Sequence, residues 1–138
     1  MGRILGETFN DISADIIIPV PLHRSGSREY NQSLLLAEGI SEIWGIPADG
    51  KILFWRNDIF PQAGKKNSSR YMIPIDAMGS SKPLEGLSVA LVDDVYTTGN
   101  TLRAAISAVE RASGKVSGAL VWSRRVSSQE NEAAWSNL

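Results

Sequence analysis

The residues most suited to chemistry lie in the stretch LVDDVYTTGNTL, residues 91–102, where an apolar run ends in two acids and a hydroxyl-rich turn follows. Gly99 can adopt backbone geometry that side chains resist. The residues after it begin a helical pattern, and the first amides of a helix lack internal partners. Such a turn binds phosphate well, because the amides, the helix dipole and nearby hydroxyls point the same way. The sequence therefore predicts a phosphate cradle over residues 97–101.

The acidic pair, Asp93 and Asp94, stands one short loop before this cradle. These carboxylates would repel a phosphate if they pointed at it, but they can accept hydrogen bonds from the hydroxyls of a sugar that carries the phosphate. They can also be outer ligands of Mg²⁺, through the sugar or through water. The expected ligand is a sugar phosphate. The alternative is an ordinary helix cap and turn, which is what many such pairs form.

Two better-known phosphate motifs do not fit this stretch. No lysine follows Gly99, as a Walker-type loop would require, and the three glycines of a dinucleotide fingerprint are missing.

Short apolar runs and helical spacings indicate the elements that position these residues. Four runs that are apolar throughout are typical of strands buried on both faces of a parallel sheet, namely residues 14–20, 51–55, 87–92 and 116–122. A weaker fifth run, 70–75, contains a proline, which favours an edge position. Apolar residues at helical spacing predict helices over residues 30–44 and 100–112, and a short opening helix around residues 4–9.

Polar loops follow the strand runs. In an open parallel sheet, ligands bind at the carboxyl ends of the strands, so these loops should converge on one ligand. Arg24 and Arg28 follow the first run, and Arg56, Lys65 and Lys66 follow the second. They could surround an anion, or they could be solvated surface cations.

Two segments resemble known family signatures. VALVDDVYTTGNTL, residues 89–102, resembles the signature that binds 5-phosphoribosyl 1-diphosphate in type I phosphoribosyltransferases. IPVPLHRSGSREYNQSLLLAEGIS, residues 18–41, looks like the segment that marks the ComF/GntX branch, the competence-protein relatives of amidophosphoribosyltransferases. The resemblance implies an α/β fold with a mostly parallel five-stranded sheet flanked by helices and a shortened amino-terminal part. We expect one such domain over residues 1–125 and a polar tail over 126–138.

The resemblance also implies roles for individual residues. Asp93 and Asp94 would hold the ribose hydroxyls and, through ribose or water, Mg²⁺. Arg24 and Arg28 would act with them in catalysis, by neutralising the leaving diphosphate. The remaining substrate-binding candidates are Pro21, Leu22, Arg56, Lys65, Lys66, Tyr96, Thr97, Thr98, Gly99, Asn100 and Thr101.

Two functions remain open from the sequence. The first is an Mg²⁺-dependent phosphoribosyltransferase that transfers the phosphoribosyl group to a nitrogen nucleophile, either a base or ammonia. The alternative is a non-catalytic ComF-like module that binds the donor or a nucleotide and is linked to competence and DNA uptake. A homodimer is a family expectation.

Composition sets limits on these functions. The 138 residues suit one core, and a formal net charge of −1 argues against a general nucleic-acid-binding domain. There is no cysteine, and no apolar stretch approaches the length needed to cross a bilayer. We therefore expect a cytoplasmic location, without membrane or direct nucleic-acid contacts. Trp44, Trp55 and Trp122 fall on patterned elements and are expected in the core.

Overall fold

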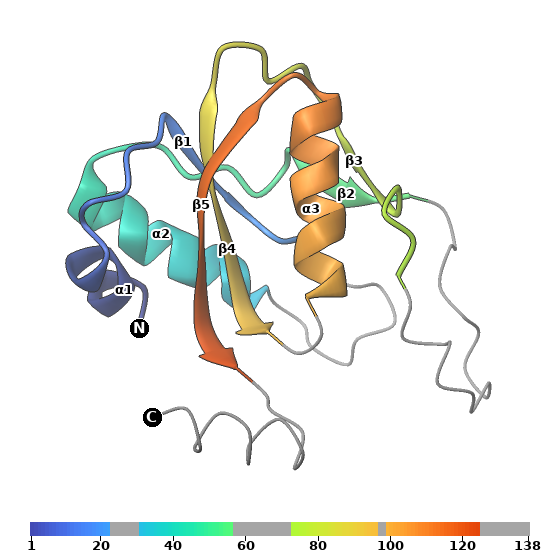
Figure 1. The fold of residues 1–138 in the computed structure, drawn as a ribbon. Helices are drawn as coiled ribbons and strands as arrows, with labels where there is room; N and C mark the ends of the chain where they lie inside the picture. The colour runs from blue at the N-terminus through green and yellow to red at the C-terminus, as the bar shows by residue number, and fades with distance from the viewer. Residues whose placement is uncertain (23–30, 57–72, 97–98, 125–138) are drawn as a thin grey trace, which may run out of the picture.

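The computed structural model describes residues 1–22, 31–56, 73–96 and 99–124, which contain both helices and strands (Figure 1). In chain order they are α1 (Gly2–Thr8), β1 (Ile16–Pro19), α2 (Gln32–Trp44), β2 (Leu53–Trp55), β3 (Met78–Ser80), β4 (Ser88–Tyr96), α3 (Asn100–Arg111) and β5 (Lys115–Arg124).

The central sheet is parallel and has β4 in its middle. Its order is β1-β4-β5, and β1 is joined on its other side by a single parallel bridge from Ile17 to Ala48. Pro19 pairs with Val92, and Val121 pairs with Asp93, so the acidic pair lies at the carboxyl edge of the sheet. The mostly parallel α/β class predicted from the sequence is therefore confirmed.

The second strand run differs from its prediction. Within the described residues, β2 does not join the parallel sheet but pairs antiparallel with β3, in a separate two-stranded sheet. The described part of the predicted edge strand, residues 73–75, forms no strand. Pro74 has no N–H for a ladder, and its carbonyl instead accepts a hydrogen bond from Ala77 N–H at 3.0 Å, which turns the chain into β3.

Two apolar clusters cover the two faces of the sheet. Val89 and Leu91 of β4 pack in the cluster that includes the buried face of α3, whereas Ala90 and Val92 pack in the cluster with α2 and α1. Figure 1 shows α2 and α3 on opposite sides of the sheet. The apolar sequence of β4 is thus explained by burial on both faces.

Glycines bring α1 and α2 into close contact. A β-carbon on Gly2 would lie 2.3 Å from the Leu36 carbonyl oxygen, and one on Gly39 would lie 2.7 Å from the Arg3 nitrogen. Backbone atoms cannot move aside as the end of a flexible side chain can, so this contact requires both glycines.

The three tryptophans expected in the core have different surroundings. The indole Nε1–H of Trp44 donates to the Gly6 carbonyl at 2.8 Å, and that of Trp55 donates to the Pro21 carbonyl at 3.0 Å. Both side chains are half-buried, and Trp55 packs against the cluster under α3. Trp122 is 40% exposed on β5, so the prediction that it belongs to the core is wrong.

Across the described ranges, no helix is long and apolar enough to span a membrane. The predicted polar tail, residues 126–138, lies outside the described residues.

Candidate functional site

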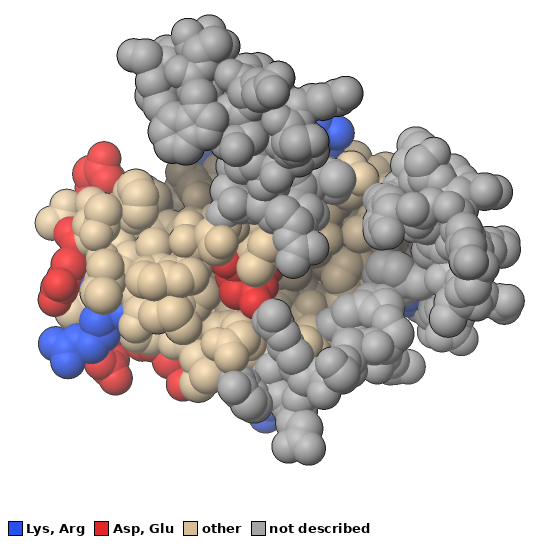
Figure 2. Space-filling model, turned by 90° about the horizontal axis from the view of Figure 1, so that it is seen from below, with Lys and Arg blue, Asp and Glu red and all other residues tan. Residues whose placement is uncertain are grey.

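A pocket of about 220 Å³ opens at the carboxyl edge of β1 and β4. It is bounded by the end of β1, the start of α2, the end of β2, the end of β4 and the start of α3. Its lining residues are Val20, Pro21, Leu22, Asn31, Gln32, Ser33, Trp55, Asp93, Asp94, Val95 and Thr101. Figure 2 looks at the molecule from this end and shows acidic side chains in a hollow near the middle of the face.

The acidic pair forms the charged part of this lining, and its two members differ in burial. Asp93 is only 8% exposed, whereas Asp94 is half-buried. Asp93 Oδ1 accepts hydrogen bonds from the Ser33 hydroxyl at 3.3 Å and from the Asp94 backbone N–H at 2.9 Å. Burial raises the pKa of Asp93 to about 7, and a side-chain hydrogen bond with Asp94 and the negative charge of Asp94 raise it further, whereas the bonds from the Asp94 backbone N–H and from Ser33 lower it. The pocket therefore holds one carboxyl that titrates near neutrality.

The segment after β1 is held from two sides. Asn31 Nδ2 donates to the Val20 carbonyl at 3.1 Å, and Trp55 Nε1 donates to the Pro21 carbonyl at 3.0 Å. Asn31 also caps α2, because its Oδ1 accepts from Ser33 N–H at 2.9 Å. These bonds fix Pro21 at the mouth of the pocket.

The turn into α3 depends on Gly99. Its φ of +84° lies in the left-handed region, and a β-carbon there would lie 2.7 Å from the Tyr96 hydroxyl oxygen. Asn100 begins α3, and Thr101 follows it into the pocket lining.

The structure brings together some predicted site residues and leaves others apart. Asp93, Asp94, Pro21, Leu22 and Thr101 line one pocket. Tyr96, Gly99, Asn100 and Arg56 are described but are outside this lining. The remaining predicted residues, Arg24, Arg28, Lys65, Lys66, Thr97 and Thr98, lie outside the described residues.

Arg56 extends the antiparallel pair of strands instead of facing the pocket. Its backbone N–H donates to the Ala77 carbonyl at 2.7 Å, and its Nη1 donates to the Asp76 carbonyl at 3.5 Å. Its predicted contact with substrate stays a prediction.

Ser33 and Trp55 are pocket residues that the sequence reasoning missed. The signal for Ser33 was its place two residues after Asn31, in the first turn of a capped helix. Trp55 carried a weaker signal, since it is the last apolar residue of a strand run and only the paired geometry shows that its indole reaches the segment after β1.

The donor set of the pocket fits Mg²⁺ only in combination with a ligand. Asp93 and Asp94 offer hard carboxylate oxygens, but no cluster of three or more metal-binding side chains occurs in the described part of the chain. Mg²⁺ is commonly bound by one or two carboxylates together with substrate phosphates and water. The arrangement suits a cation that enters with a phosphorylated ligand.

The sequence profile of the phosphoribosyl transferase domain family matches residues 31–138. The chain belongs to this family. The match includes the acidic pair, the turn at Gly99 and the start of α2, so the pocket is largely built from the family's own segment.

The competence protein ComFC of Bacillus subtilis is a similar curated protein. It is 31% identical to this chain over 100 residues, which are 69% of this chain and 39% of ComFC. This chain therefore aligns with about two-fifths of the length of that relative.

Solved structures show the same fold. The adenine phosphoribosyltransferase of Rhodothermus marinus superposes with a TM-score of 0.58 at 20% identity, over 96% of this chain and 69% of that one. The glutamine phosphoribosylpyrophosphate amidotransferase of B. subtilis, complexed with ADP and GMP, superposes with a TM-score of 0.56 at 22% identity, over 87% and 24%. At these identities the similarity establishes the phosphoribosyltransferase fold.

Proposed function

We propose that this chain binds 5-phosphoribosyl 1-diphosphate together with Mg²⁺ and transfers the phosphoribosyl group to a nitrogen nucleophile. One observation carries the proposal: the acidic pair lines a pocket that also receives the first turn of α3, where a phosphate can bind. A sugar with a phosphate on one side and a diphosphate on the other fits this order of groups.

In the proposed reaction, the bond between ribose C1 and the diphosphate oxygen breaks, and the bonding pair leaves with diphosphate. The nitrogen lone pair of the nucleophile forms the new bond to C1, and the nitrogen then loses a proton to solvent. Positive charge develops on the ribose ring during cleavage, as in glycoside hydrolysis. Mg²⁺ would supply positive charge beside the departing diphosphate.

The chain's own residues would bind and orient the donor. Asp94 and the ionised form of Asp93 would accept hydrogen bonds from the ribose hydroxyls, and Thr101 with the turn at Gly99 would hold the 5-phosphate. Pro21, whose carbonyl accepts the Trp55 hydrogen bond, and the neighbouring Leu22 would face the diphosphate. Arg24 and Arg28 would add the cations that stabilise the leaving group.

A second candidate function rests on the likeness to ComFC. A chain related to a competence protein could bind the donor or a nucleotide without turning it over and serve DNA uptake through that bound state. Both candidates use the same pocket. They differ in whether the phosphoribosyl group of the bound donor is transferred to an acceptor.

Two measurements on the wild-type chain separate the candidates. Isothermal titration with the donor, with and without Mg²⁺, tests the pocket, and diphosphate release with a panel of nucleobases and ammonia tests transfer. Binding with release supports the enzyme, and binding without release for any acceptor supports the second candidate. Absence of donor binding with Mg²⁺ present would contradict the enzyme and the donor-binding form of the second candidate, and a further absence of nucleotide binding would contradict both candidates.

A further inference from the structure

Hydrogen bonds beside the acidic pocket form a closed ring through three segments of the chain. Just after β1, Val20 N–H donates to the Val92 carbonyl of β4 at 2.8 Å, and the residue that follows Val92 is Asp93. Asp93 Oδ1 accepts from the Ser33 hydroxyl at 3.3 Å. Asn31 closes the ring, because its Oδ1 accepts from Ser33 N–H at 2.9 Å and its Nδ2 donates to the Val20 carbonyl at 3.1 Å. The ring therefore joins the ends of β1 and β4 to the start of α2.

Most of this ring is shielded from water. Val20, Ser33 and Asp93 are buried, and Asn31 is half-buried. Hydrogen bonds in such surroundings are electrostatically stronger than the same bonds in water. Because the ring is closed, the loss of one bond frees groups that the remaining bonds held in a single geometry. One substitution should therefore loosen either the Asp93 carboxyl or the segment after β1.

Two members of the ring connect parts of the pocket that would hold different parts of the donor. Asp93 is assigned to ribose, whereas Val20 leads into Pro21, which is assigned to the diphosphate. Asn31 and Ser33 also line the pocket, but each of their side-chain polar atoms already makes a bond within the ring. We infer that Asn31 and Ser33 are positioning residues, which hold the Asp93 carboxyl and the segment after β1 at a fixed separation. These roles rest on the proposed function, because they require a ligand that carries both ribose and diphosphate.

The positioning role of Asn31 can be separated from its role as a helix cap, because the two roles use different atoms. The cap of α2 uses Oδ1, whereas the bond to the Val20 carbonyl uses Nδ2. Serine is about as good an N-cap residue as asparagine, but its shorter side chain has no amide nitrogen for the Val20 carbonyl. Asn31→Ser therefore keeps the cap and opens the ring.

Isothermal titration with two probes tests these roles. The donor, 5-phosphoribosyl 1-diphosphate with Mg²⁺, would span both parts of the pocket, whereas ribose 5-phosphate would reach only the acidic part. Asn31→Ser should weaken donor binding about fivefold to tenfold, the effect of one hydrogen bond, and should leave ribose 5-phosphate binding within about twofold of the wild type. Ser33→Ala should weaken binding of both probes about fivefold, because it loosens the carboxyl that faces ribose.

A double variant shows whether Ser33 acts through Asp93. In an Asp93→Ala background, Ser33→Ala should change the affinity for the donor by less than about 1.5-fold, because the carboxyl that Ser33 positions is gone. A direct contact between the Ser33 hydroxyl and the ligand would instead give the same loss in both backgrounds. Asp93→Asn does not serve as this background, since its amide oxygen can still accept from Ser33.

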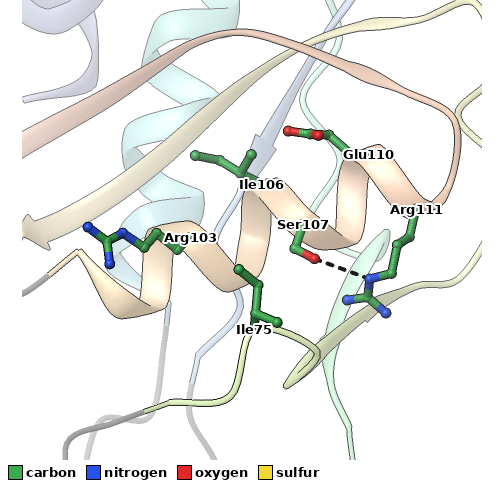
Figure 3. Close-up of a pocket in the computed structure, with 6 residues that line it drawn as sticks. All are labelled: Ile75, Arg103, Ile106, Ser107, Glu110 and Arg111. Carbon is green, nitrogen blue, oxygen red and sulfur yellow. Dashed lines mark hydrogen bonds between the residues drawn. The ribbon is translucent and has the colours of Figure 1, made fainter.

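Ser107→Ala is the matched control. Ser107 lies in a separate hollow of about 420 Å³ beside α3, where its hydroxyl accepts from Arg111 Nε at 3.2 Å (Figure 3). This hollow shares no lining residue with the acidic pocket. Like Ser33→Ala, the substitution removes a serine hydroxyl that is bonded to one other side chain, and it should leave both affinities unchanged. Circular dichroism of each variant checks that it folds.

The possible results distinguish the positioning roles from the proposed function. A wild type that does not bind the donor contradicts the proposed transfer reaction and the positioning roles together. If the wild type binds the donor, the role of Asn31 is wrong when a folded Asn31→Ser variant binds it equally well, or when this variant loses equal affinity for both probes. The role of Ser33 is wrong when Ser33→Ala causes no loss, or when it causes the same loss with and without the Asp93 carboxyl.

Discussion

Helix α2 meets the rest of the chain in two regions that are built differently. At its start, Asn31 and Ser33 contribute polar atoms to an open pocket, and they form hydrogen bonds with the segment after β1 and with β4 respectively. Further along, Gly39 lies so close to α1 that no β-carbon fits between the two backbones. The first region contains an open pocket and a buried carboxyl. In the second region the two helices pack without a gap, and no charged group is buried.

The difference shows how one helix can serve both binding and stability. Burial of Asp93 costs stability when its carboxyl ionises, and that cost is acceptable only where a ligand can use the charge. The contact between α1 and α2 contributes stability without presenting any group to a ligand. Substitutions in the two regions should therefore affect different measurements.

The largest effect is expected from the acidic pair. Asp93→Asn combined with Asp94→Asn should weaken donor binding at least about 100-fold, because each ionised acceptor of a ribose hydroxyl contributes about 1.5–3 kcal/mol. Titration calorimetry at pH 8 measures this loss. Asp15→Asn is the control, since Asp15 binds Ser88 N–H at the opposite edge of the same sheet. Equal affinities for the double variant and the wild type would contradict the assigned role.

The pH dependence of stability should also arise from the first region. Because the folded pKa of Asp93 is raised from 3.8 to about 7, the folded state binds more protons than the unfolded state between these values. Stability from this group is full below pH 4 and is lost as the pH rises to about 7. The loss should be on the order of 4 kcal/mol. Urea unfolding of the wild type and of Asp93→Asn at several pH values measures this loss. If stability depends on pH in the same way in both proteins, the prediction is wrong.

A smaller effect is expected in the second region. Gly39→Ala should lower the free energy of unfolding by about 2 kcal/mol, because the overpacking against α1 outweighs the better helix propensity of alanine. Donor affinity should not change. Glu38→Ala, at an exposed neighbouring position, should leave stability within about 0.5 kcal/mol of the wild type. Chemical denaturation measures the free energy of unfolding of both variants. A Gly39→Ala variant as stable as the wild type would show that α1 is not held by this contact.

The smallest effects are expected when either of two indole hydrogen bonds is removed. Trp55→Phe removes the bond to the Pro21 carbonyl beside the pocket and should weaken donor binding about threefold to tenfold. Trp44→Phe removes the equivalent bond to the Gly6 carbonyl and should lower stability by about 1 kcal/mol with unchanged affinity. If both variants bind the donor as tightly as the wild type does, Trp55 does not position the segment after β1.

The sequence predicts the elements of this fold where local signals are strong. The helix predicted over residues 100–112 is observed at Asn100–Arg111, because Gly99 and the apolar stripe mark it clearly. The strand predicted over residues 87–92 is observed at Ser88–Tyr96, so the prediction stopped at the acids although the strand continues through them. Polar residues at the end of a parallel strand still pair with the neighbouring strand.

Pairing between distant segments was harder to predict. The run at residues 51–55 is apolar enough for a central strand, but its partner, Met78–Ser80, is three residues long and has no strand pattern of its own. Trp122 likewise has the residue type of a core position, but it is 40% exposed on β5, and its residue type alone did not indicate that. For the site, the acidic pair was predictable from its motif, whereas Ser33 joins it across 60 positions of sequence.

The closeness of Tyr96 and Gly99 also constrains how this turn could change over generations. A side chain at position 99 would meet the phenol of Tyr96, and the φ of +84° disfavours any side chain there, so a smaller residue at position 96 would relieve only the first of these constraints. Among variants accumulated at random, position 96 should therefore change while position 99 stays glycine.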